Sequence, residues 1–438
     1  MPAATQPNSP PSATPTLDQA LRVWWQVAFL SFGGPAAQIA VMQRLIVDEK
    51  GWLDQARFNH ALNFCMLLPG PEAQQLATYI GWLLHGVRGG LLAGIIFVLP
   101  GAVLMLGLSL AYVTVGQVGL VEGLLFGLKC AVLAIVAQAL WRMAGKIVHG
   151  RAAIVIAIAA FIAMFVFNLA FPLVVLGAGL AGLLLYGREP AAAGDAVEPR
   201  PMQWRASLLC LFAWLLPLVA LLAWLGRESV WTEIAGFFSL IAVAGFGGAY
   251  AVLAWVAQFA AESRDWVTAA EMLDGLGLAE TTPGPLILVT QFVGFLAAWR
   301  HDAVLHPLLA GSLGGMLTTW VMFAPSFLWV FLFAPRIEQL RNSPRIAGAL
   351  RGITAAVVGV IANLAVWFGL RLLFADQQTL AAPGIELDLP VLATVDLLAL
   401  GLTAVAAALL FRLKWGLYPL IGTMAGLGVI AGLIGVIP

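Results

Sequence analysis

The sequence predicts an all-α polytopic membrane protein built from two homologous halves. Hydrophobic residues make up 61% of the 438 residues and charged residues 10%, whereas soluble domains have about 45–50% and about 25%. Apolar runs long enough to cross a bilayer, which takes about 20 residues, recur along the chain. Two short blocks rich in glycine and proline occur twice at one spacing. Composition thus predicts the membrane, and the repeated blocks predict two halves.

The chain begins with a stretch that differs from the rest. Residues 1–16 contain no basic residue and no apolar core, so we expect a disordered cytoplasmic tail rather than a cleaved signal peptide. A first repeat is expected over 17–186. A polar linker with an extra span follows over 187–230, and a second repeat covers 231–438.

Thirteen apolar runs are the predicted spans. They lie at about 18–45, 56–86, 89–115, 118–145, 151–169, 171–186, 206–226, 231–260, 270–299, 303–333, 345–374, 391–412 and 415–437. The first two are long and contain glycine–proline breaks, so we expect discontinuous helices there. With a cytoplasmic N-terminus, most basic loop residues fall on the cytoplasmic side, as is usual. The exceptions are Arg44, Lys50 and Arg57, so that region is either re-entrant or functional.

The repeated blocks share one offset. Phe32-Gly33-Gly34-Pro35 matches Phe246-Gly247-Gly248-Ala249, and Pro69-Gly70-Pro71 matches Pro283-Gly284-Pro285, each 214 residues later (246 − 32 and 283 − 69). Seven predicted crossings separate the repeat starts, and this odd number predicts inverted repeats. Secondary transporters often have this arrangement, with substrate at the midplane. Re-entrant Pro-Gly-Pro segments would make the count even and the halves parallel; we favour inversion.

Each repeated block should interrupt a helix, because proline lacks an N–H and glycine adopts angles closed to other residues. Broken backbone at membrane depth is tolerated only inside protein or beside a wet cavity. Each restarting helix presents unpaired N–H groups and the positive end of its dipole. Four such ends can surround a dianion. The alternative is that the blocks are packing kinks, since glycine and proline are common in membrane helices.

Polar residues near the breaks are candidate substrate contacts, because amides and hydroxyls donate hydrogen bonds to oxyanions. Together with the two pairs of blocks, apart from Ala249, we assign to substrate binding Gln38, Gln43, Arg44, Asn63 and Gln75 in the first half, and Tyr250, Thr281, Thr282 and Gln291 in the second. Some of them are expected only to satisfy freed backbone groups.

Three charged residues near or within the apolar runs are also candidates. Glu72 and Glu280 flank the Pro-Gly-Pro turns and are candidate proton-coupling groups; the alternative for Glu72 is a helix-dipole partner. Lys129 lies deep in an apolar run, where a charge usually pairs or functions. It either attracts the anion or pairs with Glu122, two turns away on the same helix face.

Several function classes lack sequence support. No phosphate-binding loop is present, so ATP is not the expected energy source. No nucleophile–base set occurs, and the cysteines and histidines lack metal-ligand spacing. The net charge of zero gives no basis for nucleic-acid binding. We therefore expect no enzyme, no cofactor and no metal.

The paired blocks carry a family resemblance. LSFGGPAAQIAVMQ (30–43) with LLPGPEAQQLATYIGW (67–82), and AGFGGAYAVLAWVAQ (244–258) with TTPGPLILVTQFVGF (281–295), resemble the chromate transporter family. The resemblance covers almost the whole chain, as two tandem family domains. It implies a secondary transporter that exports chromate across the bacterial inner (plasma) membrane, confers chromate resistance and is driven by a proton or ion gradient.

The resemblance leaves alternatives open. Sulfate is the natural analogue of chromate, so a carrier for sulfate or another oxyanion is one alternative; a passive anion channel and a lipid-handling protein are others. A second copy of the chain, as a homodimer, is a candidate partner beside the lipid bilayer. The second half has Ala249 for Pro35 and Leu286 for Glu72. We therefore expect the first half to dominate anion handling.

Overall fold

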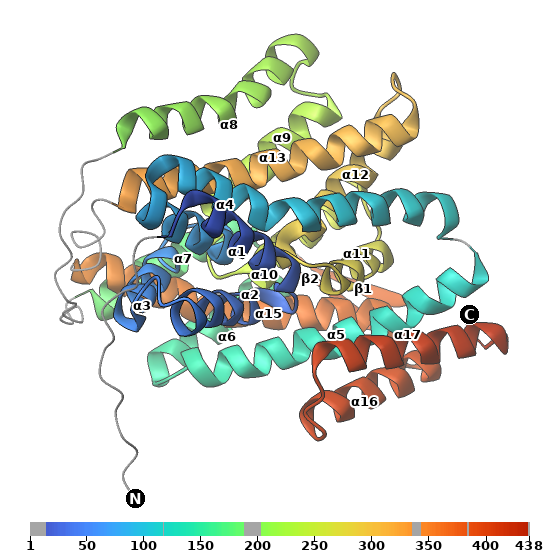
Figure 1. Ribbon diagram of the computed structural model, residues 1–438. Coiled ribbons are helices and arrows are strands. Elements are labelled where there is room, and N and C mark those ends of the chain that lie inside the picture. Colours follow the sequence, from blue (N-terminus) through green and yellow to red (C-terminus); the bar gives the residue numbers. More distant parts are fainter. Residues whose placement is uncertain (1–14, 117, 188–202, 335–342, 383–384, 437–438) are drawn as a thin grey trace, which may run out of the picture.

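The computed structural model describes residues 15–116, 118–187, 203–334, 343–382 and 385–436. The chain forms a bundle of helices, most of them roughly aligned along one axis (Figure 1). This confirms the predicted all-α class. Nearly all of the predicted N-terminal tail and most of the linker lie outside the described residues.

The first half contains seven helices and a π-helical turn. They are α1 (Leu17–Leu30), α2 (Gly34–Gln43), η1 (Arg44–Glu49), α3 (Gln55–Cys65), α4 (Glu72–Val115), α5 (Gly119–Ile147), α6 (Arg151–Phe165) and α7 (Phe171–Tyr186). Helix α8 (Trp204–Leu225) follows. Its buried residues are only Ser207 and Trp214, so most of its apolar surface faces outward, as suits a helix surrounded by lipid.

The second half repeats these elements in the same order. They are α9 (Val230–Ala244), α10 (Ala249–Val256), η2 (Ala257–Ser263), α11 (Ala269–Thr281), η3 (Leu286–Leu288), α12 (Val289–His301), α13 (Pro307–Phe333), α15 (Pro344–Leu373), α16 (Leu397–Phe411) and α17 (Leu417–Leu433). An antiparallel hairpin of β1 (Gln377–Ala382) and β2 (Ile385–Pro390), and the short η5 (Leu392–Thr394), are inserted before α16. Helix α8 and this hairpin have no counterpart in the first half.

Helix length separates spanning elements from shorter ones. Among the described helices, α4, α5, α8, α13 and α15 are long and apolar enough to cross a membrane. Helices α6, α7, α16 and α17 are apolar but have only 15–17 residues, which corresponds to about 22–26 Å.

Helix α4 is two helices joined at a sharp reversal. His85 and Gly86 have non-helical backbone angles, with φ of +62° at Gly86. The two arms pack closely, because a Cβ on Gly81 would lie 2.5 Å from the carbonyl oxygen of Gly89 and 2.7 Å from the Cβ of Ala93. The first arm therefore folds back on the second, and only the second arm is a candidate span.

The broken segments also fold back. In the second half, Glu233 at the start of α9 pairs with Arg264 after η2, at 3.1 Å. Glu271 at the start of α11 pairs with Arg300 at the end of α12. Both breaks therefore lie at the tips of helical hairpins whose outer ends meet. In the first half Gln43 bonds to Gln55, and His85 bonds to the carbonyl of Pro15.

This geometry differs from the thirteen predicted crossings. The prediction assigns one span to each of four runs, and the structure divides each of them into two short arms. These runs are 18–45, 56–86, 231–260 and 270–299. The physical reason is that glycines at positive φ allow the chain to reverse at each break. The long apolar helices are the second arm of α4, with α5, α8, α13 and α15, and the shorter apolar helices α6, α7, α16 and α17 accompany them.

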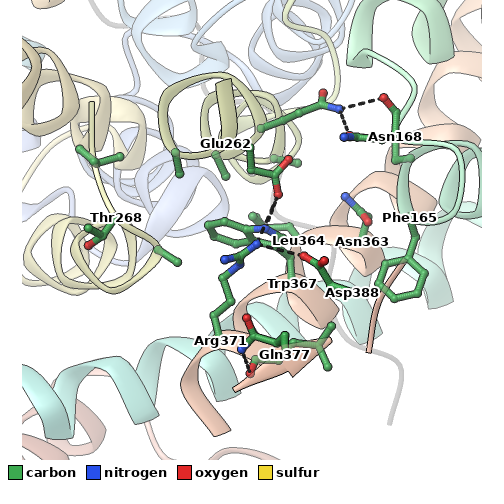
Figure 2. A pocket seen from close by; sticks show the side chains of 18 of the residues that line it. Phe165, Asn168, Glu262, Thr268, Asn363, Leu364, Trp367, Arg371, Gln377 and Asp388 are labelled. Carbon is green, nitrogen blue, oxygen red and sulfur yellow. Dashed lines mark hydrogen bonds and ion pairs between the residues drawn. The ribbon is translucent and has the colours of Figure 1, made fainter. Parts of the chain in front are cut away.

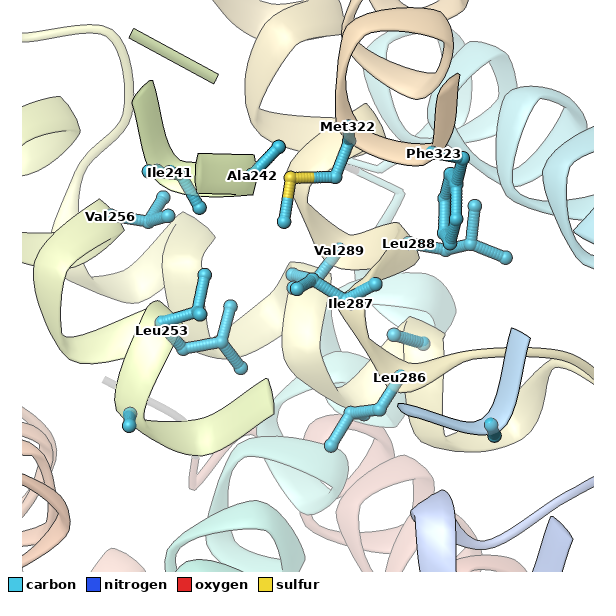
Figure 3. Packing of buried hydrophobic residues seen from close by; sticks show 14 of the residues in the cluster. Ile241, Ala242, Leu253, Val256, Leu286, Ile287, Leu288, Val289, Met322 and Phe323 are labelled. Atoms are coloured by element: carbon cyan, nitrogen blue, oxygen red, sulfur yellow. The ribbon is translucent and has the colours of Figure 1, made fainter. Parts of the chain in front are cut away.

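The halves are interlocked by their last helices. Helices α6 and α7 pack on α15 of the other half, whereas α16 and α17 pack on α5. Glycines permit close approach at both contacts: Gly182 lies against Gly352, and Gly127 against Gly428. Near the second Pro-Gly-Pro turn, Leu253, Leu288 and Met322 belong to a cluster of buried hydrophobic residues (Figure 3).

Candidate functional site

Each Pro-Gly-Pro turn is bonded to the helix break of the opposite half. The Gly70 N–H donates to the Gly245 carbonyl at 3.1 Å, and the Gly284 N–H donates to the Ser31 carbonyl at 2.7 Å. These bonds are equivalent, because both pairs are related by the 214-residue offset. Gly70 and Gly284 have φ of +104° and +98°, a region that favours glycine. The two breaks and two turns therefore form one centre shared by both halves.

Four helices begin at this centre. Helix α2 starts at Gly34 with Pro35 in its first turn, α10 starts at Ala249, α4 starts at Glu72, and η3 starts at Leu286 and leads into α12. No side chain caps any of these four starts. Uncapped N–H groups and the positive ends of helix dipoles favour an anion.

Two helices close over the turns. A Cβ on Gly101 of α4 would collide with the carbonyl oxygen of Pro283. At the equivalent position of α13, Ser326 lies over Gly70, where a Cβ would be 3.5 Å from its hydroxyl oxygen. The second arm of α4 and α13 thus contact opposite turns.

Three predicted glutamines hold main-chain carbonyls. The amide of Gln38 donates to Gly284 at 2.6 Å, Gln75 donates to Pro69 at 2.6 Å, and Gln291 donates to Ala102 at 2.9 Å. Their amide oxygens are buried and have no hydrogen-bond partner in the described part of the chain. These side chains therefore fix the two turns and the helix beside them.

The predicted hydroxyls are also engaged. Thr281 and Thr282 donate to carbonyls of their own helix, at Leu278 and Ala279. Tyr250 donates to the Glu280 carboxylate at 2.8 Å. In this conformation, each of these hydroxyl groups donates its hydrogen bond to an acceptor of the protein itself.

Three buried polar residues were missed by the assigned site. The Ser31 hydroxyl, both polar atoms of the Gln74 amide and the Thr78 hydroxyl are buried without a hydrogen-bond partner among the described residues. Each belongs to a break or to the helix that restarts after a turn. The only signal in the sequence was that these three residues lie next to the repeated blocks. That position does not indicate whether their side chains are buried.

Some predicted residues lie elsewhere. Gln43 and Arg44 are at the outer end of the α2–η1 arm, where Gln43 bonds to Gln55 and Arg44 pairs with Glu49 at 3.5 Å. Asn63 is exposed on α3. The prediction placed Gln43 and Arg44 beside the break, but α2 carries them ten residues away, about 15 Å along its axis.

The surroundings of the two turns are unequal. We call Pro69-Gly70-Pro71 turn one and Pro283-Gly284-Pro285 turn two. After turn one come Glu72, which is half-buried, and the buried Gln74 and Gln75. A Cβ on Gly248 would lie 3.8 Å from the Glu72 carboxylate. After turn two come three buried apolar residues, from Leu286 to Leu288. In the first block, Phe32 packs edge-on against Tyr418, whereas Phe246 is half-buried.

Lys129 forms an ion pair between the halves. Its Nζ lies 3.6 Å from Oδ1 of Asp274 on α11. The hydroxyl of Tyr112 donates to Oδ2 of the same carboxylate at 3.0 Å. The structure therefore gives Lys129 a partner in the other half, rather than Glu122 on its own helix.

A polar cavity opens beside α10 and η2, with a volume of about 560 Å³. Its charged wall contains Arg371, which pairs with Asp388 at 3.1 Å and lies over the ring of Trp367 (Figure 2). Gln258 and Asn168 line another part and are hydrogen bonded at 2.7 Å. The lining extends from Asp265 to Ala254. Ala254 is five residues from the start of α10, about 7.5 Å along the axis, so we name this cavity the vestibule.

No group of His, Cys, Asp or Glu within the described ranges is arranged to hold a metal ion. Among the described residues, the charged groups at or near the centre include Glu72, Glu280 and the Lys129–Asp274 pair. The chemistry that this arrangement supports is reversible binding through hydrogen bonds and charge.

Comparison with known proteins gives consistent matches. The family model described as "Chromate transporter" matches residues 19–183 and 232–435. The "Chromate transport protein" of Pseudomonas aeruginosa is 32% identical over 379 residues, which cover 82% of both chains. The "Probable chromate transport protein" of Synechococcus elongatus is 28% identical, over 81% of this chain and 85% of the relative. The "Chromate transport protein" of Cupriavidus metallidurans is 26% identical, over 80% and 81%. No solved structure matches.

Proposed function

The chain belongs to the chromate transporter family, and from that premise we propose that it is a secondary transporter that exports chromate across the bacterial plasma membrane and so confers chromate resistance. Chromate is a tetrahedral dianion, and the proposed energy source is a proton or ion gradient. The proposed binding site is the centre formed by the two turns and the two breaks.

The reciprocal bonding of turns and breaks carries this proposal. Gly70 bonds to Gly245 and Gly284 bonds to Ser31, which brings four uncapped helix starts to one place. Backbone N–H groups at helix starts bind oxyanions without a cation. The buried, unpartnered Ser31 and Gln74 add side-chain groups that a polar ligand can satisfy, because buried polar atoms without partners are costly.

Inverted halves give this centre alternate access. The second arm of α4 runs toward the end of the bundle where α13 begins, and the equivalent helices α5 and α15 also run in opposite directions (Figure 1). Both broken segments of each half fold back, so five crossings separate the repeat starts instead of seven. Five is odd, as inversion requires. Rocking of two inverted halves about a midplane site is a recurring transport mechanism.

The basic residues orient the protein. In the topology with five crossings between the repeat starts, the helix ends and loops assigned to the side of the N-terminus carry Arg44, Lys50, Arg57, Arg88, Arg142, Lys146, Arg151, Arg205, Arg345, Arg412 and Lys414. Those assigned to the other side carry Arg227, Arg264, Arg300 and Arg371. The positive-inside rule then makes the N-terminal side cytoplasmic. Folding back removes the exception of Arg44, Lys50 and Arg57. The vestibule, lined by Asp265 and Arg371, faces the outer side.

Two carboxylates at the centre are the proposed coupling groups. Glu280 is buried and accepts a hydrogen bond from the Tyr250 hydroxyl. Glu72 is the first residue of the helix after turn one. A carboxylate beside an anion repels it unless protonated, so proton binding and anion binding are linked there. Replacement of either residue by glutamine is expected to weaken the pH dependence of transport.

A matched glycine pair tests the site. We expect Gly101→Ala to abolish chromate transport, because its Cβ would collide with the carbonyl of Pro283. Gly107→Ala on the same helix is the control, since a Cβ there meets nothing within 4 Å. The measurement is intracellular chromium in a chromate-sensitive host, followed by uptake into inside-out vesicles with and without a pH gradient. Equal chromium levels with and without the wild-type protein would refute chromate export.

The same vesicles separate the alternatives. Sulfate or molybdate that competes fully and is itself accumulated would favour a general oxyanion carrier. Flux that neither saturates nor responds to a gradient would favour a passive channel. Unaltered flux in Gly101→Ala would place the site elsewhere.

A further inference from the structure

The buried ion pair between Lys129 and Asp274 lies at the contact of the two halves. Lys129 belongs to α5 and Asp274 to α11, and their side chains are only 19% and 5% exposed. The two helices touch, because a Cβ on Gly277 would lie 3.2 Å from that of Leu128. Tyr112 of α4 joins them through its hydrogen bond to Asp274.

This pair occupies a position between the centre and the outer surface. Asp274 precedes Pro283 of turn two by nine residues (283 − 274), about 13 Å along a helix. Glu271, one turn before Asp274, pairs with Arg300 at the outer hairpin end. The pair of Lys129 and Asp274 therefore lies between turn two and the outer end of this hairpin.

The charge balance of Asp274 depends on Lys129. Oδ2 of Asp274 accepts a hydrogen bond from the Tyr112 hydroxyl. Oδ1 has no hydrogen-bond partner within the described residues and forms the ion pair with the Lys129 ammonium. The ionisable groups nearest Asp274 are Lys129 from α5, Tyr112 from α4, Arg300 from α12 and Glu271 from α11 itself. Arg300 is engaged by Glu271, so it does not replace Lys129. Removing one partner from a buried ion pair is strongly unfavourable.

We propose that Asp274 is a proton-carrying residue of the transport cycle and that Lys129 switches it. A dianion that reaches Lys129 draws the ammonium away from Asp274, and the released carboxylate binds one proton. When the anion leaves, Lys129 returns to Asp274 and the proton is released. This inference rests on the proposed function and adds a residue that touches neither turn nor break.

Calorimetry on the purified full-length protein tests this link. Sulfate and chromate are titrated in two buffers of different ionisation heat, which gives the number of protons taken up per anion. We expect Asp274 to contribute about one proton to the uptake by the wild type, which makes sulfate affinity fall by a further factor of about ten per pH unit between pH 7 and 8. In Asp274→Asn this one proton is lost, whatever Glu72 and Glu280 contribute. Binding is at least as tight, because the competitor of Lys129 is gone.

Glu122→Gln is the matched control, because Glu122 is exposed on α5 two turns before Lys129; it should behave as the wild type. Proton uptake by Asp274→Asn that equals the uptake by the wild type, or anion binding by the wild type without any proton uptake, overturns the inference. A folded Asp274→Asn that no longer binds anion also overturns it.

A second measurement uses the wild type alone, in case Asp274→Asn does not fold. The infrared difference spectrum between sulfate-bound and free protein should show the C=O band of a newly protonated carboxyl group, and its absence overturns the inference. If the wild type binds neither sulfate nor chromate, the proposed function itself fails, which is a distinct outcome.

Discussion

Gln38 joins the two halves through a single hydrogen bond. Its amide reaches the carbonyl of Gly284, 246 residues later in the chain, and the side chain is 1% exposed. The sequence predicted that Gln38 belongs to the centre, because it follows the first glycine break on a restarting helix. The sequence could not tell that its donor is used by a turn of the other half, since that contact exists only in the folded chain.

Replacement of Gln38 by leucine should leave the Gly284 carbonyl without its partner. We expect a loss of about 1–3 kcal/mol, the cost of one unsatisfied buried group, with a lower melting temperature and reduced transport. Gln43→Leu on the same helix is the control, because Gln43 bonds to Gln55 at an exposed end. Equal melting temperatures of the two variants would show that the bond to Gly284 is unimportant.

At the scale of elements, the broken segments are hairpins rather than crossings. Sequence alone does not distinguish a chain that continues from one that reverses at a glycine–proline break, because both paths have the same apolar composition. It did predict where the breaks lie, and the misplaced basic cluster of Arg44, Lys50 and Arg57 was the available sign of reversal. Two ion pairs, Glu233–Arg264 and Glu271–Arg300, decide the question for the second half.

Thiol labelling from each side of the membrane distinguishes the two arrangements. In a protein lacking its three cysteines, Arg57→Cys should react with an impermeant reagent only from the cytoplasmic side, and Val304→Cys only from the outer side. Both positions are well exposed, with 68% of the Arg57 side chain and 87% of Val304 accessible. Thirteen crossings require both to react from the outer side.

The glycine contact between α5 and α17 is also a property of elements. A Cβ on Gly127 would collide with the Met424 carbonyl, whereas one on Gly145 of the same helix meets nothing within 4 Å. We expect Gly127→Ala to destabilise the protein by about 1–3 kcal/mol through overpacking. Gly145→Ala should have a normal melting temperature in detergent. A normal melting temperature for Gly127→Ala would mean that the helices separate without cost.

At the scale of the whole molecule, the halves share both their centre and their outer helices. Helices α6 and α7 complete the second half and α16 and α17 complete the first. The repeat was readable from the sequence, because the two blocks keep one offset. The sequence does not show that the last two helices of each half pack against the other half. Their apolar faces would fit a neighbour in either half. The ion pair between Lys129 and Asp274 could not be predicted either, because Asp274 is distant in sequence and approaches Lys129 only in the folded chain.

Splitting the chain between residues 187 and 203 tests this interdependence. Two fragments expressed together should assemble and transport chromate, because the contacts between the halves are non-covalent. Either fragment alone should aggregate or be degraded, since its glycine-lined surfaces lack their partners. Size-exclusion profiles and chromium accumulation are the measurements. A monodisperse single fragment with transport activity would contradict the interlocked arrangement.

The extra helix α8 has a consequence for the orientation of the two halves. In the proposed topology each half has four crossings, an even number, which alone would place the second half in the same orientation as the first. Helix α8 adds a fifth crossing between the repeat starts. In this topology one lipid-facing helix, with only Ser207 and Trp214 buried, therefore lets a single polypeptide form an antiparallel pair of halves.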